Sequence, residues 1–276
     1  DAAILFSDIL LILEPMGAGL EFTRGDGPCI HRPVRTSEDV DSLKAVEPLE
    51  SLSFVFDAVR KIRSALKPDV PLIGFAGAPF TVVSYLIEGR HSDHYLHTKS
   101  LMHTDSKAWN MLMEKVTESL SRYLNAQIDA GVQAVQVFDS WVGCLSQEDY
   151  RRFVQPHMKK LFASIKPGTP TIHFGTGTSA LLGLMQEAGG NVIGLDWRVN
   201  LADEWTRLGC KAVQGNLDPV VLLSDIKTIR AETKNLLDQV ARKPGHIFNL
   251  GHGILPQTSE DHAVALIDMV HELSSK

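Results

Sequence analysis

The chain has 276 residues, of which 44% are hydrophobic and 22% are charged, and its formal net charge is −6. These values are typical of a globular protein and exclude a disordered chain, a fibrous repeat and a small disulfide scaffold. The acidic balance argues against binding to nucleic acid or to a membrane surface, because both polyanions require a basic stripe. The length is compatible with two domains or with one α/β barrel.

The cysteines Cys29, Cys144 and Cys210 are odd in number and form no CxxC pair. This usage suits a reducing compartment and excludes a cysteine-rich zinc module, so we expect a cytoplasmic protein. The first apolar stretch, residues 2–20, is interrupted by acidic residues and a proline and lacks a basic leading region. It therefore matches neither a membrane span nor a signal peptide.

Short apolar, β-branched runs alternate with helical patterns along the chain. Seven runs are strand candidates: residues 2–6, 70–75, 133–138, 169–174, 192–195, 211–214 and 246–250. Between them, the apolar residues from Trp109 to Leu124 recur at helical spacing in a segment that stops at Gly131. The repeated strand–helix units, without a long linker, predict a single domain over residues 1–276 built on a parallel sheet.

Two local features depart from simple alternation. Residues 20–33 read as an inserted hairpin, with a turn at residues 25–28. The last helix has a start signal in Pro256, Thr258 and Asp261. A closed α/β barrel needs eight strands, so either one strand lies upstream of residue 1 or the sheet is open and doubly wound.

In either architecture the chemistry lies at the carboxyl ends of the strands. Asp8 follows an apolar run, where a carboxylate is costly unless hydrogen-bond donors or a cation meet it. A ligand with N–H groups would supply these donors, and the alternative is an aspartate that caps the next turn. His252 lies between two glycines, a usual setting for a ligand-contacting or proton-transferring histidine, although a structural histidine in a tight turn fits as well.

Three further patterns have simpler explanations. The run GTGTSA at residues 175–180, with Asp196 ending the next strand, is close to a dinucleotide-binding fingerprint, but lone glycine motifs are weak evidence. The run GFAGAPFT at residues 74–81 ends a strand and opens a helix, but it lacks the Lys-Ser/Thr pair of a P-loop. The histidines of residues 91–103 have no cysteine or acidic partner that would complete a compact zinc pattern.

Six blocks, in order, make the whole chain resemble the uroporphyrinogen decarboxylase family in its bacterial form. They are DAAILFSDIL at the start, GFAGAPFT with YLIEG ending at Gly89, QVFDSWVG ending at Gly143, GLDW ending at Trp197, QGNLDP ending at Pro219, and NLGHG ending at Gly253. The resemblance implies a single (β/α)8 TIM barrel, usually a homodimer. It also implies an enzyme, without metal or organic cofactor, that removes carbon dioxide from the four acetate side chains of uroporphyrinogen III to give coproporphyrinogen III.

The resemblance also implies roles for particular residues. Asp8 would be catalytic and would accept the inward-pointing pyrrole N–H groups of the tetrapyrrole. It would also stabilise the cationic ring that forms when a pyrrole carbon is protonated. This ring serves as the electron sink when carbon dioxide leaves. The other implied substrate-binding residues are Tyr85, Ser140, His252, Phe75 and Phe138.

One block of the family has no counterpart between Asp1 and Lys276, namely a strand ending in an arginine-bearing RQAGR-like motif. We expect this segment, with the first barrel strand, to lie upstream of residue 1. Its arginines would hold substrate carboxylates and donate protons. Their positions in the sequence do not show whether the arginines of this chain nearest the hairpin and Tyr85 lie in the cleft. These are Arg24, Arg32, Arg35 and Arg90.

Two other classes compete with the decarboxylase. Zinc-dependent methyltransferases on the same barrel would need a His-x-Cys pair, whereas His173 is followed by Phe174 and Gly175. A porphyrin-binding protein without catalysis is the other alternative.

Overall fold

The structure is a computed structural model that describes residues 1–23, 27–240 and 243–274. Its centre is one seven-stranded sheet in the order β1-β4-β5-β6-β7-β8-β9, in which every neighbouring pair is parallel. The strands are β1 (Ala3–Ile4), β4 (Leu72–Gly77), β5 (Ala134–Asp139), β6 (Thr171–Gly175), β7 (Val192–Gly194), β8 (Val213–Leu217) and β9 (His246–Leu250). All seven predicted strands are confirmed, with ends that differ by up to three residues.

The strand order excludes the doubly wound alternative. A doubly wound sheet reverses its strand order at a switch point, whereas this sheet runs in sequence from β1 to β9. The sheet is also curled, because Nε2 of Gln214 on β8 lies 3.4 Å from Oε1 of Gln136 on β5, across two intervening strands. The result is a curled parallel sheet of seven strands, and among the described residues β1 pairs only with β4 and β9 only with β8.

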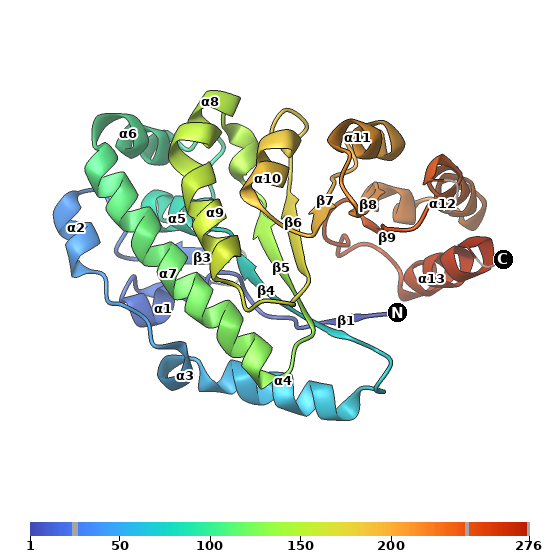
Figure 1. Cartoon of the computed structure of the whole chain (residues 1–276), viewed down its shortest axis with the longest axis horizontal. Helices are drawn as coiled ribbons and strands as arrows, with labels where there is room; N and C mark the ends of the chain where they lie inside the picture. Colours follow the sequence, from blue (N-terminus) through green and yellow to red (C-terminus); the bar gives the residue numbers. More distant parts are fainter. Residues whose placement is uncertain (24–26, 241–242, 275–276) are drawn as a thin grey trace.

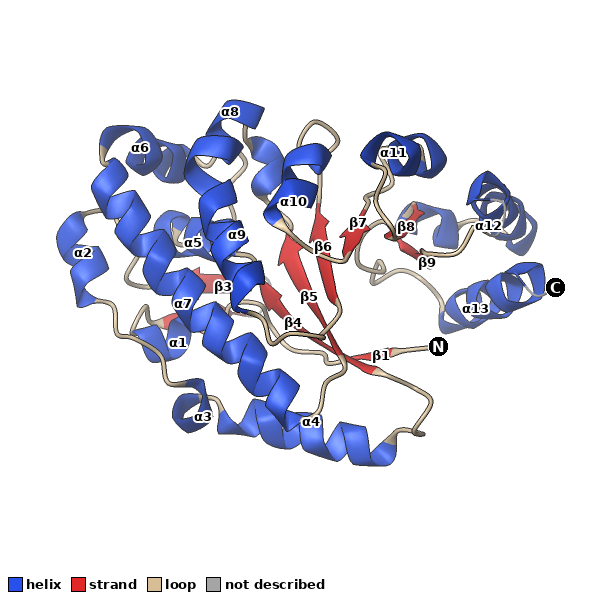
Figure 2. Cartoon of the chain, in the orientation of Figure 1, coloured by secondary structure: helices blue, strands red, loops and turns tan. Residues whose placement is uncertain are grey.

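Helices cover the outside of the curl (Figures 1 and 2). They are α1 (Leu13–Met16), α2 (Ser37–Ser42), α3 (Pro48–Ser51), α4 (Ser53–Ala65), α5 (Pro79–Glu88), α6 (Leu96–Thr104), α7 (Ser106–Ala130), α8 (Gln147–Asp149), α9 (Gln155–Ser164), α10 (Leu182–Ala188), α11 (Leu201–Leu208), α12 (Ile226–Val240) and α13 (Glu260–Ser274). Buried apolar side chains form one core cluster that runs from Leu5 to Met269. None of the described helices is both long and apolar enough to cross a bilayer.

The long helix α7 shows how the sequence pattern becomes structure. The carboxylate of Asp105 accepts the N–H of Ala108 and caps the first turn. Trp109 and Leu120 are both fully buried on the face that packs against the core. The helix ends at Gly131, whose φ of +119° lies in the left-handed region that favours glycine, as the sequence predicted.

The inserted hairpin is confirmed as the antiparallel pair β2 (Leu20–Thr23) and β3 (Gly27–Ile30). Its predicted turn lies partly outside the described residues, at 24–26. The predicted start of the last helix is one residue early, because the hydroxyl of Ser259, and not that of Thr258, accepts the N–H of His262 at 3.2 Å. The helix α13 accordingly begins at Glu260.

Candidate active site

Asp8 lies in the loop that follows β1, and its carboxyl group is half-buried. Its Oδ1 accepts the N–H of Leu10 at 2.7 Å, so the turn-capping alternative describes a real contact. Burial nevertheless raises the pKa of Asp8, and this hydrogen bond lowers it by less. The carboxyl group thus has room for further donors, because an ionised carboxylate can accept several N–H groups.

Tyr85 comes from α5, which Pro79 opens directly after β4. Burial, and next the negative charge of Asp8, raise the pKa of Tyr85 to about 12. The phenol and the carboxyl group are therefore close enough to interact, and the phenol keeps its proton at neutral pH. Two predicted residues from separate strand–helix units of the chain therefore interact electrostatically in the structure.

The ring of Tyr85 stacks on Trp141, with ring centroids 3.6 Å apart. Trp141 follows β5, and its backbone N–H donates to Oγ1 of Thr81, with the nitrogen 3.3 Å from the oxygen. Thr81 lies one turn before Tyr85 on α5. The hydroxyl of Thr81 in turn donates to Oδ1 of Asp139 at 2.9 Å. A chain of contacts thus fixes the loop after β5 against α5.

Asp139 is the last residue of β5 and is completely buried. Its Oδ2 has no hydrogen-bond partner among the described residues. Burial raises the pKa of Asp139 to about 7, against a smaller lowering by its hydrogen bonds with Thr81. This carboxyl group faces α5, because side chains alternate along a strand and Phe138 points to the other face of the sheet.

Ser140 is half-buried in the loop between Asp139 and Trp141. The predicted apolar residues Phe75 and Phe138 meet edge to face, with centroids 5.8 Å apart. Phe174 on β6 extends this layer, with its centroid 6.0 Å from that of Phe138. The three rings form an apolar floor inside the curl, and the sequence analysis missed Phe174 because nothing in the local pattern separates it from a core residue.

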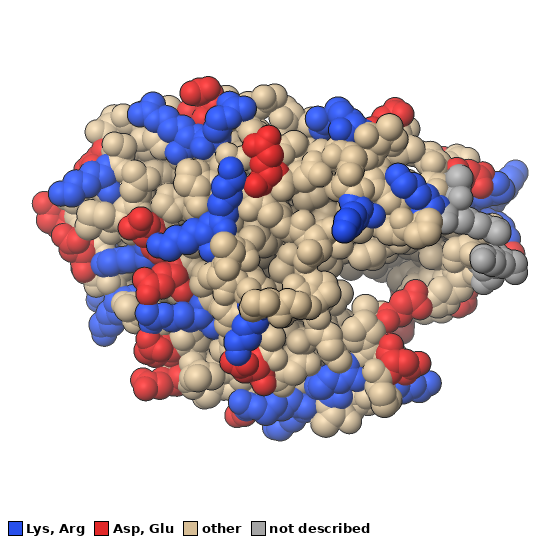
Figure 3. All heavy atoms as spheres, viewed as in Figure 1, with Lys and Arg blue, Asp and Glu red and all other residues tan. Residues whose placement is uncertain are grey.

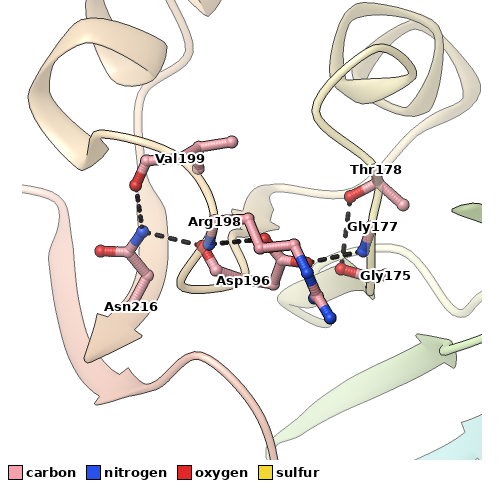
Figure 4. A network of polar contacts seen from close by, with 7 residues as sticks. All are labelled: Gly175, Gly177, Thr178, Asp196, Arg198, Val199 and Asn216. Atoms are coloured by element: carbon pink, nitrogen blue, oxygen red, sulfur yellow. Dashed lines mark hydrogen bonds and ion pairs between the residues drawn. The ribbon is translucent and has the colours of Figure 1, made fainter. Parts of the chain in front are cut away.

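A second group of residues lies at the carboxyl end of β7 (Figure 4). Asp196 is 2% exposed and its carboxylate accepts three bonds, from the N–H of Gly177 at 2.6 Å, the N–H of Arg198 at 3.0 Å and Nη1 of Arg198 at 2.7 Å. The side-chain amide of Asn216 on β8 donates to the carbonyl groups of Asp196 and Val199, both at 2.8 Å. The network ties together the loops that follow β6 and β7.

His252 belongs to this second group and is exposed on the loop after β9. Its ring meets Trp197 edge to face, with centroids 6.1 Å apart. The close approach depends on Gly251, because a Cβ atom there would lie 2.4 Å from the backbone nitrogen of Trp197. The predicted residues therefore fall in two groups, one around Asp8 and Tyr85 and one around His252.

The two groups meet where the loops after β5 and β6 touch. A Cβ atom at Gly143 would lie 2.3 Å from the carbonyl oxygen of Thr176, so only glycine fits there without a shift. Sequence reasoning missed Trp141 and Arg198, each of which lies two residues after a strand-end aspartate. That spacing is the signal that could have found them.

The glycine-rich run at residues 175–180 does not form a dinucleotide site. The N–H of Gly177 is bonded to Asp196, and α10 begins only at Leu182. The described residues also hold no group of three or more His, Cys, Asp or Glu side chains suited to a metal ion. His173 is completely buried, and burial lowers its pKa to about 4, as expected for a neutral core histidine.

Among the arginines weighed from the sequence, Arg35 donates Nη2 to the carbonyl of Glu88 at 3.3 Å, and Arg32 and Arg90 are exposed. Arg24 lies outside the described residues. On the face drawn in Figure 3, basic and acidic side chains are intermixed, without a field of one sign. An opening is visible on this face beside the end of β1 and the segment that leads to α13 (Figures 1 and 3).

The sheet is parallel and curled, and ionisable and aromatic residues gather at its carboxyl edge. These two features define the class of α/β-barrel-like enzymes, whose active sites are built from the loops that follow the strands. Comparison with solved structures supports the fold. A methyltransferase from Methanosarcina mazei superposes with a TM-score of 0.85 at 21% identity, over 99% of this chain and 81% of that one.

Sequence comparison shows the family. The family model "Uroporphyrinogen decarboxylase (URO-D)" matches residues 1–273. A uroporphyrinogen decarboxylase of Sorangium cellulosum is 53% identical over 99% of this chain and 79% of its own length, and one of Thermus thermophilus is 50% identical over 100% and 80%. The chain belongs to the uroporphyrinogen decarboxylase family, a family of carboxy-lyases, and spans about four fifths of the length of these relatives.

Proposed function

We propose that this chain removes carbon dioxide from the four acetate side chains of uroporphyrinogen III and gives coproporphyrinogen III. The observation that carries the proposal is the half-buried Asp8 at the carboxyl edge of the sheet, in a chain that belongs to this family. Burial raises the pKa of Asp8, and its charge acts on Tyr85. Pyrrole N–H groups are the donors that would stabilise the ionised form of such a carboxyl group.

The chemistry follows from this placement. Protonation of a pyrrole carbon makes the ring cationic, and the Asp8 carboxylate stabilises that charge as it develops. The bond between the acetate methylene and its carboxylate then breaks, carbon dioxide leaves, and the electron pair neutralises the ring. A second proton on the resulting exocyclic carbon forms the methyl group, and loss of the first proton from the ring carbon restores the neutral pyrrole, so one proton is consumed for each carbon dioxide released. Tyr85, Ser140 and His252 would hold carboxylates or position a proton donor, and Phe75 and Phe138 would line the ring face.

The test is an anaerobic incubation with uroporphyrinogen and a chelator, followed by oxidation and chromatography of the porphyrins by carboxylate number. Stepwise loss of acetate carboxylates in the presence of the chelator supports a metal-independent decarboxylase. Absence of turnover both in this chain and in a version extended upstream would overturn the proposal and favour the methyltransferase or binding-protein alternatives.

Asp8→Ala sharpens this test. We expect turnover to fall by roughly 10²-fold or more, because the main stabiliser of the cationic ring is removed. The melting temperature should change little, since Asp8 lies in a loop. Asp238→Ala is the matched control, because Asp238 is an exposed aspartate on α12 that pairs with Lys234. Near-normal activity of Asp8→Ala would refute the central role of this carboxyl group.

We also propose that an eighth strand, from outside the 276 residues, enters between β1 and β9 and closes the sheet into a (β/α)8 barrel of one domain. Both strands have an unpaired edge among the described residues, and apolar side chains are exposed along them: Ile4 and Phe6 at β1, and Ile247 at β9. Phe6 is 98% exposed, which is costly for so large an apolar side chain. Slower amide exchange of β1 and β9 in the upstream-extended chain would support this closure, and unchanged exchange would contradict it.

The remaining proposals concern assembly and location. A homodimer in the cytoplasm fits the family resemblance and the three free cysteines. Light scattering on the purified chain measures the oligomeric state, and a monomer at all working concentrations would contradict the dimer.

A further inference from the structure

We propose that Arg198 is a substrate-binding residue that contacts a carboxylate group of the tetrapyrrole. The inference rests on the proposed function and adds a residue that sequence reasoning did not select. It concerns the second group of site residues, in which Arg198 contacts Asp196 and Trp197, and Trp197 in turn contacts His252.

The guanidinium of Arg198 is held from two sides. Its Nη1 bonds the carboxylate of Asp196 at 2.7 Å, and its Cζ lies 3.9 Å above the ring of Trp197. These contacts fix the plane of the group, so that a ligand does not have to order a flexible side chain. The arginine side chain is nevertheless 49% exposed, so its opposite edge is open to a ligand.

The position of the guanidinium matches the site. Arg198 follows the carboxyl end of β7, at the same edge of the sheet where Asp8 and Ser140 follow β1 and β5. Trp197, over which it stacks, contacts the ring of His252. Figure 4 shows the guanidinium projecting away from Asn216, on the side of Asp196 where the Gly175–Thr178 loop lies.

The chemistry of the ligand requires such a group. Uroporphyrinogen is rich in carboxylates, whereas this chain carries a formal net charge of −6, so binding depends on local donors and not on the overall field. A guanidinium has five N–H groups and binds a carboxylate in a bidentate way. One Nη1 bond to Asp196 leaves other N–H groups of Arg198 for a ligand. Because Asp196 offsets part of the positive charge, directional hydrogen bonding contributes more than net attraction.

The experiment compares Arg198→Gln and Arg198→Lys with the unchanged chain. Glutamine can keep a bond to Asp196 but loses the charge and the fork, and lysine keeps the charge alone. Arg207→Gln is the matched control, since Arg207 is an exposed arginine on α11 that pairs with Glu204. The readouts are kcat and KM for uroporphyrinogen, and the affinity for oxidised uroporphyrin measured by quenching of tryptophan fluorescence.

We expect Arg198→Gln to raise KM and weaken uroporphyrin binding by roughly tenfold, with kcat within about twofold, because a charge-assisted bond to the bound carboxylate is lost. The KM and the uroporphyrin affinity of Arg198→Lys should fall between those of the unchanged chain and of Arg198→Gln. Arg207→Gln should match the unchanged chain in both. The loss should be smaller at high ionic strength, where charged contacts are screened.

Equal affinity of the unchanged chain and Arg198→Gln for uroporphyrin, with equal melting temperatures, would overturn the proposal. A fall in kcat without a change in KM or affinity would also overturn it, since it would assign Arg198 to another step. Absence of turnover both in the unchanged chain and in its upstream-extended version contradicts the proposed function instead, and the binding measurement then still tests Arg198.

Discussion

Two buried aspartates lie at the carboxyl edge of the same sheet, and their surroundings differ. Asp139, the last residue of β5, accepts a hydrogen bond from the hydroxyl of Thr81, and its Oδ2 has no hydrogen-bond partner among the described residues. Asp196 after β7 receives two N–H bonds and a guanidinium bond. Both are almost inaccessible to water, at 0% and 2% exposure.

The comparison shows that burial alone does not determine what a carboxyl group does. Burial raises the pKa of Asp139 to about 7 because its hydrogen bonds with Thr81 offset only part of the desolvation, so this group gains or loses a proton near neutral pH. Asp196 is met by a cation and by backbone donors, and it serves as an acceptor that holds two loops. One side of the site thus contains a titratable group and the other a structural ion pair.

The largest expected effect is on the pH dependence of stability in Asp139→Asn. In the unchanged chain the unfolded state loses this proton near the usual pKa of 3.8 and the folded state only near about 7. As pH rises between these values the unfolded state is favoured, so stability falls by up to about 4 kcal/mol. Asparagine lacks this titration, and its stability relative to the unchanged chain should grow by roughly 2–3 kcal/mol from pH 5 to pH 8.

Urea unfolding across this pH range measures the difference. If the stability curves of Asp139→Asn and the unchanged chain run parallel, Asp139 does not titrate there. Asp238→Asn, at the exposed aspartate on α12, is the control for a carboxylate without burial.

The second-largest effect is expected for Asp196→Ala. This substitution should lower the free energy of unfolding by roughly 2–3 kcal/mol, because the N–H of Gly177 loses its acceptor in a closed loop. The loss should stay below that of a fully buried ion pair, because the half-exposed Arg198 can be hydrated again. Chemical unfolding measures this loss of stability in Asp196→Ala and in Asp196→Asn, which keeps a side-chain acceptor. If Asp196→Ala lowers stability no more than the substitution of an exposed aspartate does, the hydrogen bonds of Asp196 do not hold the loops together, and the contrast with Asp139 fails.

The smallest effect is expected for Thr81→Val, which keeps the shape of the side chain and removes its hydroxyl. The loss at pH 5 should be about 1 kcal/mol, the net value of a typical hydrogen bond. Because the hydroxyl stabilises the ionised form of Asp139, its removal raises the pKa of that group further. The stability transition should therefore move to higher pH, and a transition at an unchanged pH would show that Thr81 does not influence Asp139.

The strands illustrate how far the sequence predicts the fold. Each of the seven predicted apolar runs is a strand, because a strand covered by helices needs apolar side chains on both faces. The ends were less exact. Asp139 was taken as a residue beyond its strand, whereas it pairs with Gly175 inside the ladder. A polar residue that pairs within a sheet cannot be told from a loop residue by its own neighbours, because the pairing depends on a distant segment.

The site shows the same division. Asp8, Tyr85, Ser140 and His252 were selected from their places after strands or within family blocks. Their separation into two groups was not predictable, because it depends on tertiary contacts, such as the stacking of Trp141 on Tyr85 and the edge-to-face contact of Trp197 with His252. Arg198 was missed for the same reason, since its orientation follows from Asp196 and the neighbouring tryptophan.

The amino-acid sequence was enough to predict a globular α/β chain of the uroporphyrinogen decarboxylase family, with seven strands and polar residues after them. Local apolar periodicity and short residue blocks carry that information, and both are readable along the chain. The curl of the sheet from β1 to β9 depends on contacts in three dimensions. So does the difference between Asp139, which among the described residues is bonded by Thr81, and Asp196, which accepts three N–H bonds from Gly177 and Arg198. The physical reason is that a carboxyl group responds to the donors and solvent around it, and these come from segments far away in the sequence.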